Sequence, residues 1–232
     1  MKVLISDSLS QSGLDLLAEQ EDLEVDVKAN LTQEELILHI GNYDALIIRS
    51  ATQVTTEVLA ATDRLKIIGR AGVGIDNVDV NAATEKGILV FNTPNGNTVA
   101  AAEHTIALMI GVYRKLQLQF KSVQDGKWMS NIRTDWFSQA HELTGKTVGI
   151  IGVGRIGSRV AKRLQGWECE LIYHDVVDPD SELVSDLSMK KVELDELLST
   201  SDIITLHVPL NRNTRGMISD REFDLMKSSA IL

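Results

Sequence analysis

The sequence predicts an α/β protein in which helices cover parallel β-sheets. Short apolar segments alternate with helical patterns along the chain, and a glycine-rich turn at residues 152–157 joins an apolar segment to a helical one. Alternation of this kind is typical of parallel sheets, because each parallel crossover needs a connection that is usually a helix. The stretch 93–97, which contains proline, glycine and two asparagines, predicts a domain boundary, so that residues 1–97 and 98–232 form separate domains.

The first domain, residues 1–97, is expected to be flavodoxin-like. Its helical segments carry apolar residues at three- and four-residue spacing, and Thr32 with Glu35 forms a capping-box pattern. Its expected strands are 2–6, 23–27, 45–49, 66–70 and 89–92, and its expected helices are 11–20, 32–40, 55–61 and 80–86.

The second domain, residues 98–232, is expected to begin with one long helix over 98–124 that ends at Gly126. The segment 128–141, with Trp128 and Trp136, has little periodicity and predicts a loop or short helix on a surface. The expected strands that follow are 147–151, 171–174 and 203–208, and the expected helices are 154–164, 193–199 and 220–226.

The glycine-rich turn predicts a dinucleotide site of the Rossmann type. In such a site Gly152 makes the tight turn, Gly154 lets the backbone approach a pyrophosphate, and Gly157 lets helix and strand pack closely. The helix N-terminus then offers unpaired N–H groups to the anion. The alternative is an ordinary strand–helix crossover in which the glycines serve only packing.

An acidic residue at the expected distance supports the dinucleotide interpretation. Asp175 follows the next strand-like segment, where a carboxylate can accept both ribose hydroxyls of an adenosine. Val176 and Val177 follow it, and neither side chain can neutralise a 2′-phosphate. The sequence therefore favours NAD over NADP.

Composition excludes several classes of partner. The net charge of −10 argues against nucleic acid and anionic membrane surfaces, and no apolar stretch approaches a membrane span. The single cysteine, Cys169, excludes an internal disulfide and fits a reducing compartment, and there is no cluster of Cys and His for a metal. We expect a cytoplasmic protein without a metal site whose partner is a small molecule.

Five segments in order resemble the D-isomer-specific 2-hydroxyacid dehydrogenases. They are RSAT at 49–52, GRAGVGIDNVD at 69–79, NTPNGNTVAAAE at 92–103, LTGKTVGIIG at 143–152 and TLHVPL at 205–210. The resemblance implies a substrate domain followed by an NAD-binding domain, a hinge at 93–97 and catalysis in the cleft between the two domains. The closest likeness is to the member that oxidises a phosphorylated 2-hydroxy acid in serine biosynthesis.

By this resemblance the substrate would be held by the first domain. Arg49 and Arg70 would face its phosphate, and backbone N–H groups at Val73 and Gly74 would hold its carboxylate. Arginine grips phosphate through two N–H groups, and glycine-rich turns expose backbone amides. The alternatives are an ordinary surface charge for Arg49 and a structural ion pair for Arg70.

The resemblance also assigns residues on the cofactor side. Arg155 and Ile156 would lie along the pyrophosphate of NAD, and Val208 with Pro209 would lie against the adenine or its ribose. His207 would lie at the cofactor cleft without transferring a proton, as a histidine packed at a strand end.

The catalytic arginine, glutamate and histidine of the family would follow residue 232, so no catalytic residue is expected in this chain. Residues 226–232 read as a helix end followed by the start of a buried strand. We therefore expect a C-terminally truncated chain with an incomplete NAD-binding domain that is inactive alone. We expect the complete form to be a homodimer or a higher homo-oligomer.

Two alternatives remain open at this point. Gln53 and Val73 stand where other members differ, so the substrate could be glycerate, lactate or a similar 2-hydroxy acid. A second possibility, from another class, is a short protein that binds NAD or pairs with a full-length subunit without catalysis.

Overall fold

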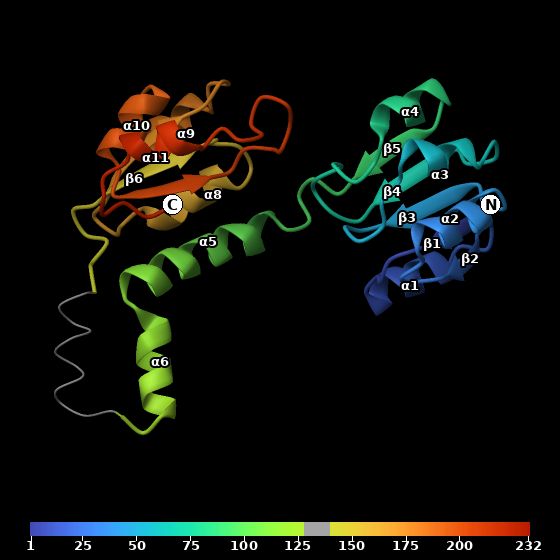
Figure 1. Cartoon of the computed structure of the whole chain (residues 1–232), viewed down its shortest axis with the longest axis horizontal. Coiled ribbons are helices and arrows are strands. Elements are labelled where there is room, and N and C mark those ends of the chain that lie inside the picture. The colour runs from blue at the N-terminus through green and yellow to red at the C-terminus, as the bar shows by residue number, and fades with distance from the viewer. Residues whose placement is uncertain (128–139) are drawn as a thin grey trace. The chain divides into compact units, whose positions relative to one another are not determined.

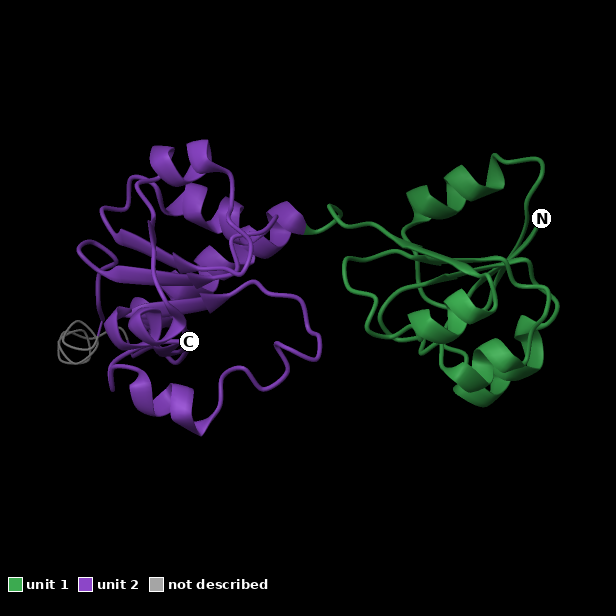
Figure 2. Ribbon diagram, turned by 90° about the horizontal axis from the view of Figure 1, so that it is seen from above, with its two compact units in different colours: residues 1–97 green, residues 98–232 purple. Residues whose placement is uncertain are grey.

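The computed structural model describes residues 1–127 and 140–232. The chain divides into two compact units, Met1–Asn97 and Thr98–Leu232, each of which has its own sheet and core (Figure 2). The surface segment expected around Trp128 and Trp136 lies outside the described residues. Among the described residues, no helix combines the length and the apolar character needed to cross a membrane.

The first unit contains a five-stranded parallel sheet with the strand order β2-β1-β3-β4-β5 (Figure 1). This is the flavodoxin-like order, so the predicted fold of this unit is confirmed. The strands are β1 (Lys2–Ile5), β2 (Glu24–Val27), β3 (Ala45–Ile48), β4 (Ile67–Arg70) and β5 (Leu89–Asn92), and the helices are α1 (Gln11–Ala18), α2 (Gln33–Ile40), α3 (Thr56–Ala60) and α4 (Val80–Glu85).

Local sequence signals explain where these elements begin and what they bury. The Thr32 hydroxyl accepts the N–H of Glu35, and the Glu35 carboxylate accepts the N–H of Thr32, so the predicted capping box starts α2. The side chains of Leu4, Leu46 and Ile68, on three neighbouring strands, are fully buried in the core of this unit.

The described part of the second unit contains a four-stranded parallel sheet with the order β8-β7-β6-β9. Ile231 adds an isolated parallel bridge beside Ile203. The strands are β6 (Thr147–Ile151), β7 (Glu170–His174), β8 (Lys190–Lys191) and β9 (Ile203–Leu206), and the helices are α5 (Thr98–Tyr113), α6 (Leu116–Gln124), α8 (Gly157–Leu164), α9 (Ser181–Asp186), α10 (Leu194–Thr200) and α11 (Asp220–Leu225).

The expectation of one continuous helix over 98–124 is wrong. The chain leaves α5 after Tyr113 and starts α6 at Leu116, and α6 runs in a different direction (Figure 1). Lys115 lies in the left-handed region with φ 54°, which ends the first helix. Neither glycine nor proline marks this break, so the helical pattern continued through it. The structure also adds α9 and β8, which the sequence analysis did not anticipate, and α8 begins at Gly157 rather than at Gly154.

Candidate functional site

The candidate nucleotide site lies at the carboxyl edge of the sheet in the second unit. β6 has β7 on one side and β9 on the other, so the connections that leave β6 and β9 diverge at this edge. Doubly wound sheets bind ligands at such a switch point, because the diverging loops leave a crevice. Residues 152–156 follow β6 and residues 207–210 follow β9, so the two predicted cofactor segments are neighbours.

The three glycines of the turn have three different steric reasons. Gly152 has φ +91°, and a Cβ there would be 2.9 Å from Cγ1 of Val208. A Cβ at Gly157 would overlap the carbonyl oxygen of Gly152, so this position brings α8 against the turn. A Cβ at Gly154 would meet nothing within 4 Å, and it would project into open space. Protein packing therefore explains glycine at 152 and 157, whereas no contact within the protein requires it at 154.

The same turn carries backbone N–H groups without a protein acceptor. The described residues supply no hydrogen-bond acceptor to the N–H groups of Gly154, Arg155 or Ile156. Ile156 is also the N-cap of α8, and its side chain makes no capping hydrogen bond. A helix N-terminus with unpaired N–H groups attracts an anion through its partial positive charge. The residues present therefore fit the pyrophosphate of a dinucleotide.

Asp175 lies at the end of β7, beside the glycine turn. Its Oδ2 accepts the N–H of Val153 at 2.7 Å, and its Oδ1 accepts the N–H of Val177 at 3.0 Å. A carboxylate has about four lone-pair sites, so two backbone bonds leave acceptors for ribose hydroxyls. Val176 and Val177 are exposed, at 94% and 70%. They place apolar side chains, and no cation, next to Asp175.

His207 directly follows β9 and is held through both its backbone and its ring. Its backbone N–H donates to the carbonyl of Ile151 at 2.8 Å, and its Nε2 lies 3.0 Å from the hydroxyl of Thr205. Burial lowers the pKa of the imidazole, which keeps it neutral at neutral pH. Val208 packs against Gly152, and Pro209 is exposed beyond it.

The predicted substrate residues of the first unit lie at the end of β4 or in the loops after β3 and β4. Arg49 is held through its backbone, because Oδ2 of the buried Asp7 accepts the N–H of Arg49 at 2.6 Å and that of Thr52 at 3.2 Å. The guanidinium of Arg49 donates only one long hydrogen bond among the described residues, at 3.3 Å to the carbonyl of Ser8. Its side chain is exposed at the loop and retains donors for an anion.

The turn at Gly72–Gly74 carries two more of the predicted residues, Val73 and Gly74. Asn92 donates to the carbonyl of Val73 at 2.5 Å, and the N–H of Thr93 donates to the carbonyl of Gly72 at 3.0 Å. The described residues offer no acceptor to the N–H groups of Val73 and Gly74. Unpaired backbone N–H groups in a turn are the kind of donor that can bind an anion.

Arg70 lies over this turn. A Cβ at Gly72 would overlap its Nη1, so glycine makes room for the guanidinium. Arg70 has no carboxylate partner among the described ion pairs. Its Nε donates at 3.0 Å to Asn77, a residue that the sequence analysis did not single out. The fold of the loop brings the two side chains together, so no sequence motif indicates this contact.

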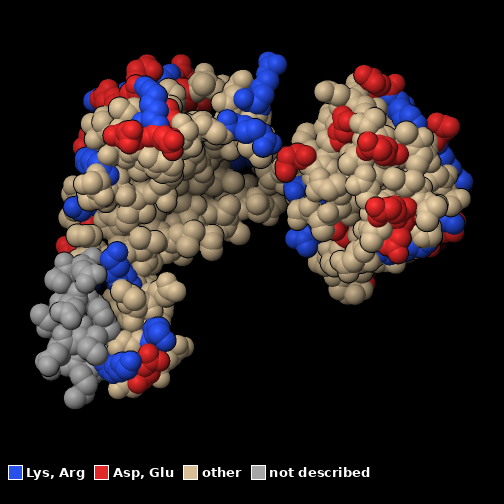
Figure 3. All heavy atoms as spheres, viewed as in Figure 1, with Lys and Arg blue, Asp and Glu red and all other residues tan. Residues whose placement is uncertain are grey.

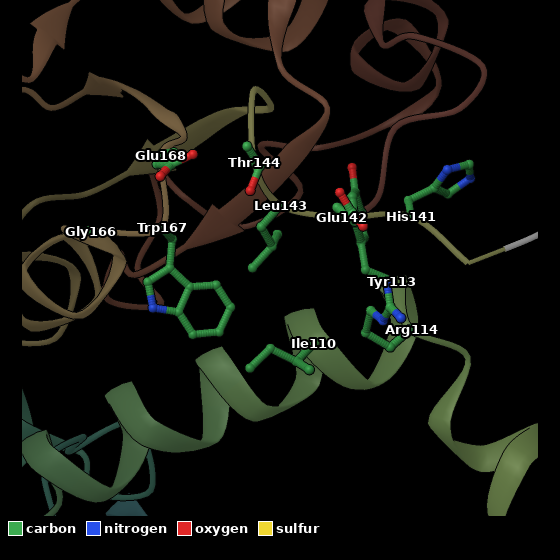
Figure 4. Close-up of a pocket in the computed structure, with 10 residues that line it drawn as sticks. All are labelled: Ile110, Tyr113, Arg114, His141, Glu142, Leu143, Thr144, Gly166, Trp167 and Glu168. Atoms are coloured by element: carbon green, nitrogen blue, oxygen red, sulfur yellow. The ribbon is translucent and has the colours of Figure 1, made fainter. Parts of the chain in front are cut away.

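A separate hollow of about 420 Å³ lies at the opposite, amino edge of the second sheet (Figure 4). Trp167 and Leu143 approach Ile110 of α5 there, while Arg114 and Glu142 lie at the other end of the group. The sequence analysis did not identify this hollow, because its lining comes from three segments without a motif. It lies away from the glycine turn, so it is not part of the nucleotide site.

The charge of the described surface is mixed. On the face drawn in Figure 3, basic and acidic side chains are interspersed over both units, and no broad basic patch gathers there. Within the described ranges there is also no group of three His, Cys, Asp or Glu residues that could hold a metal ion.

Comparison with known proteins agrees with this geometry. The family D-isomer specific 2-hydroxyacid dehydrogenase, NAD binding domain, matches residues 106–232. The D-3-phosphoglycerate dehydrogenase of Archaeoglobus fulgidus is 43% identical over 232 residues, covering 100% of this chain and 43% of that protein. The D-3-phosphoglycerate dehydrogenase of Synechocystis is 42% identical over 229 residues, covering 99% of this chain and 40% of that protein. The chain thus spans about two fifths of the length of these curated relatives.

Solved structures give the same picture. The TT0316 protein of Thermus thermophilus has a TM-score of 0.87 and 32% identity, covering 100% of this chain and 72% of that chain. The D-lactate dehydrogenase of Aquifex aeolicus, solved with NAD and lactic acid, has a TM-score of 0.84 and 30% identity, covering 99% of this chain and 67% of that chain.

Proposed function

This chain belongs to the D-isomer specific 2-hydroxyacid dehydrogenase family, and on that premise we propose that the whole protein is a D-3-phosphoglycerate dehydrogenase. It would oxidise 3-phosphoglycerate to 3-phosphohydroxypyruvate with NAD. The observation that carries the cofactor part is the glycine turn, with open space at Gly154 and unpaired N–H groups at residues 154–156. The relatives named D-3-phosphoglycerate dehydrogenase, 40–43% identical to this chain, support the choice of substrate.

In this proposal the second unit binds the cofactor. The N–H groups of Gly154, Arg155 and Ile156 receive the pyrophosphate, and Gly157 keeps α8 close enough for its N-terminus to contribute. Asp175 accepts the adenosine ribose hydroxyls. When bound, NAD supplies the hydride acceptor, and the protein supplies position and electrostatics.

On the opposite side of the same crevice, the loop after β9 bounds the adenosine. Val208 already packs against Gly152, and Pro209 is exposed next to it, so together they offer an apolar surface to the adenine or its ribose. His207 keeps this loop in place and stays neutral, and we assign it no proton transfer.

The first unit would bind the substrate. The unpaired N–H groups of Val73 and Gly74 are suited to its carboxylate, and the guanidinium groups of Arg49 and Arg70 are suited to its phosphate. Arginine is the residue that binds phosphate through two parallel hydrogen bonds. Two dedicated arginines favour a phosphorylated substrate over lactate.

We also propose that the protein works as a homo-oligomer in the cytoplasm. Leu108 of α5 and Leu118, Phe120 and Val123 of α6 are exposed apolar side chains, which support the proposal of an interaction surface on these helices. Cys169 is half-buried, and burial raises the pKa of its thiol, which fits an unreactive cysteine in a reducing compartment. Light scattering of the purified protein measures the oligomeric state directly.

The substrate assignment is tested by the rate of NADH formation with protein of the full length of its relatives. We expect 3-phosphoglycerate to give a higher kcat/KM than D-lactate and D-glycerate. Arg49→Gln should lower kcat/KM for 3-phosphoglycerate by about tenfold or more, and should change D-lactate oxidation far less. A protein that prefers D-lactate, or an Arg49→Gln variant that loses both activities equally, would contradict the assignment.

A further inference from the structure

Asn77 is a buried amide that makes three hydrogen bonds. It lies in the loop between β4 and α4 and is 5% exposed. Its Oδ1 accepts from Nε of Arg70 at 3.0 Å, and its Nδ2 donates to the carbonyls of Arg49 at 2.8 Å and Thr52 at 2.7 Å. One N–H donor faces Oδ1 and two carbonyl acceptors face Nδ2, so only one orientation of the amide is compatible with its neighbours.

These three bonds join the two loops that carry the arginines. One carbonyl partner belongs to Arg49 itself, and the side-chain partner is Arg70, so a single planar group fixes the position of both. Asp7 holds the same β3 loop from the other side through the N–H groups of Arg49 and Thr52. The backbone of this loop is therefore held by side chains on both its N–H and its C=O groups.

The bond at Nε also decides what the rest of the Arg70 guanidinium can do. Because Nε is occupied by Asn77, the two terminal nitrogens of the fork remain for other partners, and Nη1 lies against Gly72. This places the remaining donors beside the turn whose Val73 and Gly74 N–H groups are unpaired. Without the Asn77 acceptor, the long side chain would lose the contact that selects this rotamer.

We propose that Asn77 is a positioning residue that orients Arg70 and the Arg49 loop for a phosphorylated substrate. This inference rests on the proposed function for the substrate, whereas the orientation of Arg70 does not. Asparagine is suited to the role because it offers two donors and an acceptor in one plane. Aspartate would turn an oxygen toward two carbonyl oxygens, and their repulsion would move the carboxylate away from the position in which Oδ1 of Asn77 meets Nε of Arg70.

The test uses Asn77→Asp in the 232-residue chain, with Asn81→Asp as the matched control, because Asn81 is exposed nearby on α4. Two readouts are taken: the NMR resonance of the Arg70 Nε–H group, assigned with Arg70→Lys, and the affinities for 3-phosphoglycerate and NAD. We expect Asn77→Asp to shift the Arg70 resonance and to weaken 3-phosphoglycerate binding by about tenfold, with NAD binding unchanged. Asn81→Asp should change none of these.

Each remaining outcome has a defined meaning. An unchanged Arg70 resonance in Asn77→Asp overturns the positioning role even if binding is weaker, and 3-phosphoglycerate binding within twofold of the control overturns it as well. If Asn77→Asp does not fold, Asn77→Ser replaces it with the same expectations, because a short hydroxyl cannot reach all three partners. A wild-type chain that does not bind 3-phosphoglycerate contradicts the proposed function, and the Arg70 resonance still decides whether Asn77 orients the arginine.

Discussion

The carboxylate of Asp175 accepts the backbone N–H of Val153 at 2.7 Å, and this bond connects the end of β7 to the glycine turn after β6. One residue therefore has two tasks in the proposed site: it supports the loop that receives the pyrophosphate, and it presents acceptors to the adenosine ribose. The N–H of Val153 points at the carboxylate, so the groups left for the anion are those of residues 154–156.

Replacing Asp175 should therefore weaken cofactor binding in two ways. Asp175→Asn keeps the shape but loses the charge, and its amide nitrogen cannot accept a ribose hydroxyl. We expect the Kd for NAD, measured by calorimetry, to rise by about tenfold to a hundredfold, which corresponds to about 1.4–2.8 kcal/mol. Asp178→Asn is the control, because Asp178 is exposed and pairs with Lys191. Equal NAD affinities in the two variants would contradict this role of Asp175.

Substitution of two glycines in the turn should affect different properties: Gly157→Ala the stability of the protein, and Gly154→Ala its affinity for NAD. Gly157→Ala places a Cβ onto the carbonyl oxygen of Gly152, so we expect the free energy of unfolding to fall by about 1–3 kcal/mol. Gly154→Ala meets no protein atom within 4 Å and its φ is not positive, so we expect normal stability with NAD affinity reduced by about tenfold. Urea unfolding and NAD titration measure the two effects, and the reverse pattern would refute these assignments.

The left-handed backbone at the break between α5 and α6 should lower the free energy of unfolding of the protein. Lys115 adopts φ 54°, which costs a non-glycine residue about 1–2 kcal/mol. Lys115→Gly should raise the free energy of unfolding by about 1 kcal/mol, because glycine adopts this conformation without strain. The matched control is Lys121→Gly inside α6, which should lower it by about 1 kcal/mol. Destabilisation by both substitutions in urea melts would mean that the helix does not break at Lys115.

Acid should weaken the first unit through Asp44. Its carboxylate accepts two hydrogen bonds from Arg64, at 2.9 and 3.1 Å, and one from the N–H of Lys2 at 2.7 Å. These contacts, led by the bond to Arg64, hold the pKa of Asp44 well below its ordinary value. A depressed folded-state pKa stabilises the protein above the unfolded pKa of about 4, and this contribution is lost as the pH falls below it.

The measurement is the urea midpoint of the chain at about pH 6 and about pH 3. We expect the wild type to lose more stability between the two than Asp44→Asn, whose side chain does not titrate. Asp63→Asn serves as the control, because Asp63 is exposed and contacts only Lys86 among the described ion pairs. If Asp44→Asn shows the same pH dependence as the wild type, the low pKa of Asp44 does not contribute to stability.

The sequence was sufficient for the parallel sheets and for the glycine turn, because both follow from local patterns. Alternation of apolar strands and helices determined the layers, and the capping box at Thr32 and Glu35 marked the start of α2. The break at Lys115 could not be read from the sequence, since lysine has no preference for left-handed backbone.

The contacts that hold the residues of the candidate site in place could not be predicted from the sequence either. Asn77 and Asp7 contact Arg49 from loops that are distant along the chain, and only the strand order of the sheet brings them together. The bond from Val153 to Asp175 depends on the pairing of β6 with β7 in the same way. Motifs identify the residues that face a ligand, whereas the residues behind them are fixed by topology.

The most direct test of the account is a titration of the 232-residue chain with NAD, followed by backbone amide NMR. We predict one NAD per chain, NADP binding at least about tenfold weaker, and the largest amide shifts at Gly154, Arg155, Ile156 and Asp175. No binding, or shifts confined to the hollow beside Trp167, would contradict the claim that the glycine turn after β6 is the cofactor site.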